Sequence, residues 1–200
     1  QVIASFWASG PTAARYMLTG APAWSGEAVN ERTALSLSTV WACVNLLSGL
    51  QASLPIHVYR ETQDGGRESH NDHPVGHLLR VSPNADQSAF EFWQFMTAAL
   101  ELRGNAFAIK HLSDSGALVA LEPIEAPVHV ARAAAGGLQY EFTQHGQASK
   151  LGSDQVLHVR GFIPTLLGGM STLEYGRHTL GSAIAAERVV EEEVEAVLLE

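Results

Sequence analysis

Residues 88–112 read SAFEFWQFMTAALELRGNAFAIKHL, a stretch that predicts a helix followed directly by a strand. Ser88 and Glu91 form a capping box, in which the hydroxyl and the carboxylate each bind a backbone amide at the start of a helix. Gly104 stands where a left-handed cap ends a helix. Between the two caps, apolar side chains recur at helical spacing, which predicts a helix over 89–103. Its apolar face consists of Phe92, Phe95, Met96, Ala99 and Leu100.

C-terminal to this helix, the sequence predicts several short strands separated by turns. Glycine after small or polar residues marks the turns, as in Asp114-Ser115-Gly116 and His145-Gly146. Helices combined with short antiparallel strands are typical of the α+β class, which is the fold class we expect. The expected strands cover 105–112, 117–122, 127–132, 138–143 and 155–160.

N-terminal to residue 88, the strongest pattern is a helix with an N-cap at Ser36. It must end before Pro55, because proline cannot continue a helix and also restricts the residue before it. Trp41 lies among apolar residues at helical spacing, so we expect it in the core together with Phe95.

Weaker signals fill the remaining N-terminal half. Branched and aromatic residues over 56–59 favour a strand, and Pro74 favours the first turn of a short helix. Residues 1–35 show no period and are expected to form an irregular N-terminal arm. The expected organisation is therefore this arm, an α+β domain over 36–170 and a projecting helix over 171–200.

The C-terminal segment predicts one long helix. Ser171 with Glu174 predicts a second capping box, and 172–199 contains no proline. Gly168 and Gly169 before it are expected to form a bend that lets the helix leave the domain. Such a helix is too long for a small domain to bury, so its apolar stripe predicts a contact with another subunit; the alternative is a solvated, acidic chain end. The residues predicted at this subunit interface are Leu180, Ile184, Val190 and Val194.

The composition is that of an acidic, globular protein. The 200 residues include 21 acidic and 12 basic side chains, which gives a formal net charge of −9. Without a basic stripe, sequence-specific binding to nucleic acid is disfavoured. Cys43 is the single cysteine, which excludes an internal disulfide and a CxxC motif. No apolar run is long enough to span a membrane, and no secretory signal is evident.

Two groups of side chains suggest chemistry. His70, Asp72, His73 and His77 are donors of the kind that bind zinc, which supports an alternative function as a small metal-dependent hydrolase. The simpler interpretation is a polar loop with His73 near a helix start. No HExxH motif or cysteine ligand set accompanies these residues, so we expect no metal and no cofactor.

Asp154 and His158 are the second group. Four residues apart on a strand they would face the same side, as a carboxylate that orients a catalytic imidazole must. No GxSxG motif accompanies them. The simpler interpretation is that Asp154 caps a turn and that His158 pairs across the sheet.

Several short stretches together resemble a known family. They occur in the same order and at similar spacing over residues 39 to about 188, and the sequence resembles the N-terminal wing and stem portion of tailed-bacteriophage (prophage) portal proteins. The stretches are TVWACV (39–44), LPIHVY (54–59), HPV (73–75), LRGNAFA (102–108), VLHVR (156–160) and GGMSTL (168–173).

The resemblance implies a structural, non-enzymatic subunit of a ring, usually dodecameric, at a capsid vertex. Double-stranded DNA would be packaged and ejected through the ring without sequence specificity. The implied partners are further copies of the chain, a terminase, the major capsid protein and head-tail adaptor proteins, with no membrane. The implied location is the virion, with assembly in the bacterial host cytoplasm. A weaker alternative is a different capsid or adaptor component with a similar wing-like domain.

The resemblance also assigns roles to segments. Residues 36–170 would be the wing, and the helix from Ser171 would begin the stem, with the chain expected to be truncated before the clip. Acidic residues near its end would face the channel and keep DNA off the wall by repulsion; the alternative is an outward face that contacts a neighbouring subunit or a scaffold. These candidate channel-facing residues are Glu191, Glu192, Glu193 and Glu195.

Overall fold

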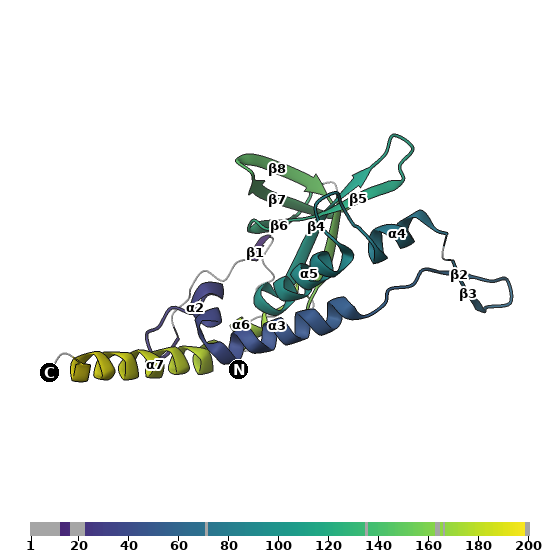
Figure 1. Ribbon diagram of the computed structural model, residues 1–200. Helices are drawn as coiled ribbons and strands as arrows, with labels where there is room; N and C mark the ends of the chain where they lie inside the picture. The colour runs from purple at the N-terminus through teal and green to yellow at the C-terminus, as the bar shows by residue number, and fades with distance from the viewer. Residues whose placement is uncertain are drawn as a thin grey trace.

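The computed structural model describes residues 13–16, 23–70, 72–134, 136–162, 165 and 167–198, the first of these ranges as backbone only. It has the expected α+β class, with helices and small antiparallel sheets and a C-terminal helix that extends from the body (Figure 1). The helices are α2 (Glu31–Ser36), α3 (Ser38–Ser53), α4 (Pro74–Arg80), α5 (Ala89–Arg103), α6 (Thr172–Tyr175) and α7 (Arg177–Leu198). The strands are β1 (Ala13–Tyr16), β2 (Tyr59–Glu61), β3 (Arg67–Ser69), β4 (Asn105–Leu112), β5 (Leu118–Pro123), β6 (Val128–Arg132), β7 (Leu138–Gln144), β8 (Gln147–Gly152) and β9 (Val156–Arg160).

Helix α5 has the predicted bounds and both predicted caps. The Ser88 hydroxyl accepts a hydrogen bond from the Glu91 amide, and the Glu91 carboxylate accepts one from the Ser88 amide. Gly104 ends the helix with φ of 71°. The chain then turns straight into β4, the middle strand of the sheet β5-β4-β9. One core cluster lies between α5 and this sheet; its fully buried members include Phe92, Met96, Ala106, Ala108 and Leu121.

A second sheet has the order β1-β6-β7-β8 and packs beside the first. Its buried side chains include Val128, Val130 and Phe142. The predicted turn at His145-Gly146 joins β7 to β8, with positive φ at both residues. Strands β8 and β1 were not among the predicted strands. Strand β8 is a largely exposed edge strand without a regular apolar alternation, and β1 lies in the segment expected to be an irregular arm.

The structure corrects the N-terminal helix boundary. Ser36 ends α2 instead of capping a longer helix, and the capping box belongs to Asn30 and Thr33. Helix α3 begins at Ser38 and ends, as predicted, before Pro55. The strand predicted over 56–59 is also displaced, because pairing begins only at Tyr59 in the β2–β3 hairpin, which projects from the body (Figure 1).

Trp41 is not a core residue. It is 57% exposed and lies at an open groove between α3 and α5, which Phe95 also lines. Phe95 is half-buried against the cluster under α5. The prediction for Trp41 was wrong because helical spacing shows which side of α3 meets α5. It does not show how many residues on that side α5 covers.

The C-terminal segment is not one continuous helix. Gly176, with φ of −84° and ψ of 6°, ends α6 after a single turn, and α7 then runs from Arg177 to Leu198. At about 1.5 Å per residue, α7 is about 33 Å long, and its distal half extends beyond the body (Figure 1). In the part of the chain that the structure describes, no helix is long and apolar enough to cross a membrane.

Candidate functional site

Three glycines bring four segments together where the terminal helices leave the domain. The Gly161 amide donates a hydrogen bond of 2.8 Å to the Gly104 carbonyl. A Cβ atom at Gly169 would lie 2.5 Å from that same carbonyl oxygen, and one at Gly104 would collide with the Met170 backbone. Real Cβ atoms do not approach so closely, so only glycine permits the backbones to cross here. The end of α5, the start of β4, the end of β9 and the 167–171 segment therefore meet at this glycine junction.

Asn105 holds the glycine junction by hydrogen bonds. Its side chain is fully buried; the oxygen accepts from the Gly169 amide at 2.8 Å, and the nitrogen donates to the Gly169 carbonyl at 3.0 Å. The same nitrogen donates to the Arg103 carbonyl at 3.3 Å. Because buried amide groups must be paired, this arrangement fixes the orientation of Asn105 and ties the segment before α6 to β4.

His158 extends the network from Asn105 to the second sheet. Its Nε2 lies 2.9 Å from the Asn105 oxygen, and its Nδ1 lies 3.2 Å from the Tyr140 hydroxyl. Since the Asn105 oxygen is an acceptor, Nε2 carries the proton and Nδ1 accepts from Tyr140. The imidazole also packs against the Phe107 ring, with a centroid distance of 4.4 Å.

Burial sets the charge state of this histidine. Desolvation, with a smaller contribution from the positive charge of Arg160, lowers the pKa of His158 to about 4. Burial likewise raises the pKa of Tyr140. The pair therefore forms a neutral link between β9 and β7 at physiological pH.

The catalytic interpretation of Asp154 and His158 does not match this geometry. Asp154 is exposed in the turn before β9, whereas the ring nitrogens of His158 face Asn105 and Tyr140. His158 pairs across the sheets, as in the simpler interpretation. The residue pattern pointed to His158 but not to Asn105, although Asn105 directly follows the predicted helix cap.

Further polar contacts hold α6 and α2 in place near the glycine junction. The Ser171 hydroxyl is buried and accepts from the Glu174 amide, which caps α6. At the C-terminal end of α5, next to the glycine junction, Arg103 makes a two-pronged contact with Glu31 of α2, with distances of 2.8 and 3.1 Å. Two parallel charged hydrogen bonds of this kind give directional attachment.

The proximal half of α7 packs on the chain itself. Leu180 and Ile184 are half-buried against a cluster that contains Val29 and Leu102. Gly181 is buried, and a side chain there would collide with Ala23. The predicted interface residues Leu180 and Ile184 thus contribute to an internal contact.

The distal half of α7 has no such support within the described residues. Arg188 marks the change, because it pairs with Glu27 at 2.8 Å and lies 3.7 Å from Glu192. Beyond it every side chain to Leu198 is exposed, including Val190 and Val194 at 58% and 52%. The prediction that these residues meet another subunit is compatible with this exposure and stays a prediction.

The four acidic residues do not share one direction. A helix rotates by about 100° per residue, so Glu191 and Glu195 lie on one side, with Glu192 next to them. Glu193 points about 160° away from Glu195. All four are exposed. A single channel-facing surface can therefore include Glu191, Glu192 and Glu195, but not Glu193.

The four candidate zinc donors do not come together in the structure, where Asp72 and His77 are exposed and only His70 and His73 contact each other. His73 is the N-cap of α4, where its Nδ1 accepts from the Val75 amide at 3.2 Å. The rings of His70 and His73 meet edge to face, 5.4 Å apart. Among the residues that the structure describes, no three His, Cys, Asp or Glu side chains are grouped to hold a metal ion.

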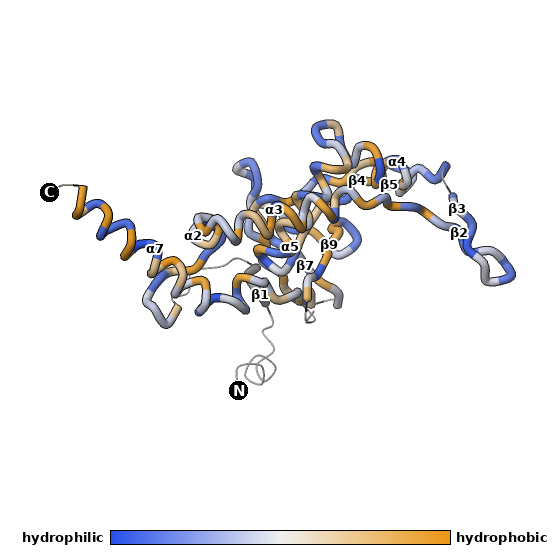
Figure 2. The backbone as a smooth tube through the Cα atoms, turned by 60° about the horizontal axis from the view of Figure 1, so that its bottom comes forward, coloured by the Kyte–Doolittle hydropathy of each residue, from blue (hydrophilic) through white to orange (hydrophobic). Residues whose placement is uncertain are grey.

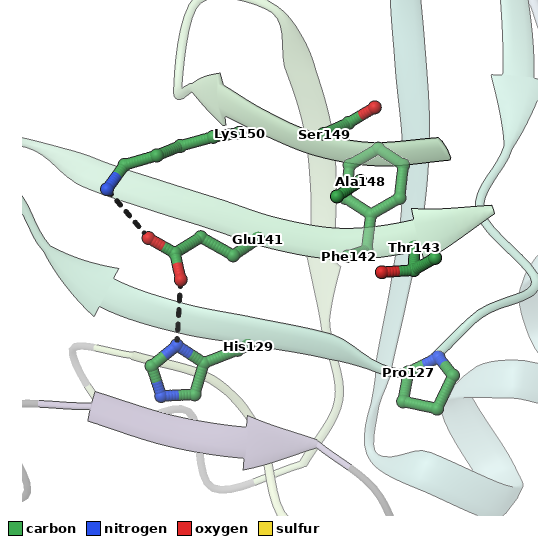
Figure 3. A pocket seen from close by; sticks show the side chains of 8 residues that line it. All are labelled: Pro127, His129, Glu141, Phe142, Thr143, Ala148, Ser149 and Lys150. Carbon is green, nitrogen blue, oxygen red and sulfur yellow. Dashed lines mark ion pairs between the residues drawn. The ribbon is translucent and has the colours of Figure 1, made fainter. Parts of the chain in front are cut away.

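A shallow hollow on the β6-β7-β8 face contains a chain of charged groups (Figure 3). Glu141 lies between Lys150, at 2.8 Å, and His129, at 3.9 Å. The hydrogen bond and charge of Lys150 lower the pKa of Glu141. These side chains are well exposed, so the ion pairs contribute little to stability and give the hollow no concentrated charge.

The model of the family described as phage portal protein matches residues 38–195. The chain belongs to the phage portal protein family. It is 31% identical over 160 residues to the portal protein of Enterobacteria phage HK97, covering 80% of this chain and 38% of the relative. It is 29% identical over 183 residues to a probable portal protein of Streptomyces phage phiC31, covering 84% of this chain and 39% of the relative. The chain thus spans less than two fifths of the length of either portal protein.

Solved structures with the same fold come from the necks of gene transfer agent (GTA) particles. The neck of an empty GTA particle, computed with C6 symmetry, contains a chain that matches with a TM-score of 0.69 and 22% identity. That match covers 82% of this chain and 45% of the other. The neck of a native GTA particle, computed with C12 symmetry, matches with a TM-score of 0.65 and 20% identity over 82% and 43% of the two chains. The predicted portal resemblance and the α+β fold are confirmed.

Proposed function

We propose that this chain is the wing and the start of the stem of a portal subunit, which forms a dodecameric ring at one vertex of a phage-type capsid. The observation that carries the proposal is the family match, which covers residues 38–195. The shared fold with chains in particle necks, one of them computed with C12 symmetry, supports the ring. In this proposal residues 36–170 are the wing, and the stem begins at Ser171.

Double-stranded DNA passes through such a ring during packaging and ejection. The net charge of −9 supports passage without sequence-specific binding, because an acidic chain repeated around a ring repels phosphates. The partners are other copies of the chain, a terminase, the major capsid protein and head-tail adaptor proteins. The ring assembles in the host cytoplasm and remains in the virion, where its role is structural and non-enzymatic.

The glycine junction gives this function a physical basis. A stem helix must keep a defined angle to the wing if every copy is to fit the same ring. The buried Asn105 hydrogen bonds, the Gly104–Gly161 backbone contact and the Arg103–Glu31 pair support such a rigid joint. Distal to this joint, Val190 and Val194 are free to meet a neighbouring subunit.

Negative-stain electron microscopy of the protein expressed from its complete gene tests the proposal. Rings with a central channel are the expected result. Monodisperse small particles at high protein concentration would contradict it. A variant with Gly169→Ala, which disturbs the junction, is expected to form fewer closed rings than the wild-type protein.

A further inference from the structure

The outward side of α3 is an unpartnered apolar surface. Helix α3 contains no charged residue along its sixteen positions. Its inward side packs on α5 through Val40, Val44 and the buried Ser48. The side of the helix next to this buried one, about 100° around the axis, exposes a set of apolar side chains that we call the α3 stripe. The α3 stripe consists of Cys43, Leu46, Leu47, Leu50 and, directly after the helix, Leu54.

The α3 stripe is continuous and unusually exposed. Its residues follow the spacing i, i+3, i+4, i+7 and i+11, which aligns them on one side of a helix. Leu46, Leu50 and Leu54 are 61%, 57% and 57% exposed. A helix that is apolar on both sides is normally covered on both sides, and contiguous apolar surface of this kind marks an interaction site.

We propose that a second copy of this chain covers the α3 stripe in the assembled ring. This inference rests on the proposed function. In a ring of more than two subunits every subunit presents two different surfaces, one to each neighbour. The distal stripe of α7, which includes Val190 and Val194, supplies at most one of them. Figure 2 shows that this helix alternates apolar and hydrophilic positions, whereas α3 has no charge at all.

Charge favours a second copy over other occupants. Copies of a chain with a net charge of −9 repel one another over most of their surface. The α3 stripe is where two copies approach at the least electrostatic cost. Nucleic acid and anionic membranes are poor occupants, because both are recognised by clustered basic side chains and α3 has none.

Cys43 provides a direct measurement, because it is exposed at the start of the stripe. Rings and unassembled subunits of the full-length protein are treated with a maleimide, and labelling of the Cys43 peptide is followed by mass spectrometry. We expect labelling in rings to be at least tenfold slower than in subunits. If Cys43 is labelled at the same rate in intact rings as in unassembled subunits, the inference is overturned and the proposed function still stands. If the protein forms no rings, the inference and the proposed function both fail.

A matched pair of substitutions tests the same surface. Leu47→Glu inserts a carboxylate into the α3 stripe, while Leu112→Glu makes the same change at an equally exposed leucine, 48% in both cases, on β4. Both sites are exposed, so both variants should fold, which circular dichroism checks. We expect Leu47→Glu to reduce the ring fraction at least tenfold and Leu112→Glu to leave it near wild type. Rings of Leu47→Glu at the wild-type level would contradict the proposal.

Discussion

His158 links stability to pH at the scale of a single residue. Its folded-state pKa of about 4 lies below the ordinary value of 6.5, so the unfolded state binds more protons between these two values. The stabilisation is therefore fully present above about pH 6.5 and is lost as the pH falls toward 4. A shift of this size corresponds to a free energy on the order of 3 kcal/mol.

We expect the urea midpoint of the wild-type protein to fall between pH 7 and pH 5. His158→Gln removes the titrating group, so it should lower stability at pH 7 and flatten this part of the pH dependence. His57→Gln, at a histidine outside the buried network, is the matched control and should keep the wild-type slope. An unchanged slope in His158→Gln would show that other groups control acid unfolding.

Gly169 is the second residue whose replacement is predicted to be costly. A Cβ atom there meets the Gly104 carbonyl oxygen at 2.5 Å and the Gly161 nitrogen at 2.6 Å. Both neighbours are backbone atoms, which cannot move aside as a side chain can. We expect Gly169→Ala to lower the free energy of unfolding by about 2–4 kcal/mol.

The control for Gly169 is a glycine with open surroundings. Gly49 lies within α3, and a Cβ atom added there would meet nothing within 4 Å. Because alanine is the better helix former by about 1 kcal/mol, Gly49→Ala should be neutral or stabilising. Chemical unfolding of both variants makes the comparison, and equal effects would refute the tight crossing at Gly169.

At the scale of the element, helix caps distinguish the correctly predicted α5 from the corrected α2–α3 boundary. The Ser88 hydroxyl accepts a hydrogen bond from the Glu91 amide, whereas the Ser36 hydroxyl donates one to the Thr33 carbonyl at the end of α2. Loss of an N-cap costs about 1 kcal/mol. We therefore expect Ser88→Ala to destabilise the protein by about 1 kcal/mol and Ser36→Ala by less than about 0.5 kcal/mol. Equal losses in thermal unfolding would argue that Ser36 also caps a helix.

The two halves of helix α7 differ in how they are supported by the rest of the chain. Its first turns are held by Leu180, Ile184 and the buried Gly181, while the turns beyond Arg188 are exposed. A helix supported at one end only is stabilised further when a partner covers its apolar side. Assembly should therefore protect the backbone amides of the distal half, including Val190 and Val194, against hydrogen exchange.

At the scale of the whole molecule, α7 and the β2–β3 hairpin project from opposite sides of the body (Figure 1). Such a shape exposes surface that a single chain cannot cover. In the proposed ring, we expect the side of α7 that carries Glu191, Glu192 and Glu195 to face the channel and to repel DNA. Repulsion between like charges keeps DNA mobile and is weakened by salt.

Lysine substitutions test this placement. The double variant Glu191→Lys and Glu195→Lys should slow DNA translocation in a packaging assay at low salt, because attraction replaces repulsion on one side of the helix. Glu193→Lys, on another side, makes the same kind of charge change and should have a smaller effect. Unchanged rates in low salt would exclude the channel-facing placement. Loss of ring formation would indicate that the acidic residues contact a neighbouring subunit.

Local signals in the sequence determined most of the elements. The Ser88–Glu91 box, the Gly104 cap and Pro55 act on residues within a few positions, so they could be recognised without knowing the fold. The same holds for the strands between turn glycines. The edge strand β8 was missed, because Leu151 is its only large apolar residue and the strand therefore lacks the apolar alternation by which a strand is recognised.

Only the tertiary structure shows the hydrogen bonds of the glycine junction and which side chains of α3 are exposed. Asn105 and Gly169 are 64 positions apart, and no local pattern indicates that they share hydrogen bonds. The exposure of Trp41 likewise depends on how far α5 covers the groove, not on the spacing of apolar residues along α3. Sequence by itself determined the fold class, the major helices and the family. These can be recognised from patterns within a few residues and from the order of those patterns along the chain. The joint that holds α7 and the uncovered side of α3 arise from contacts between distant segments, which only the folded chain brings together.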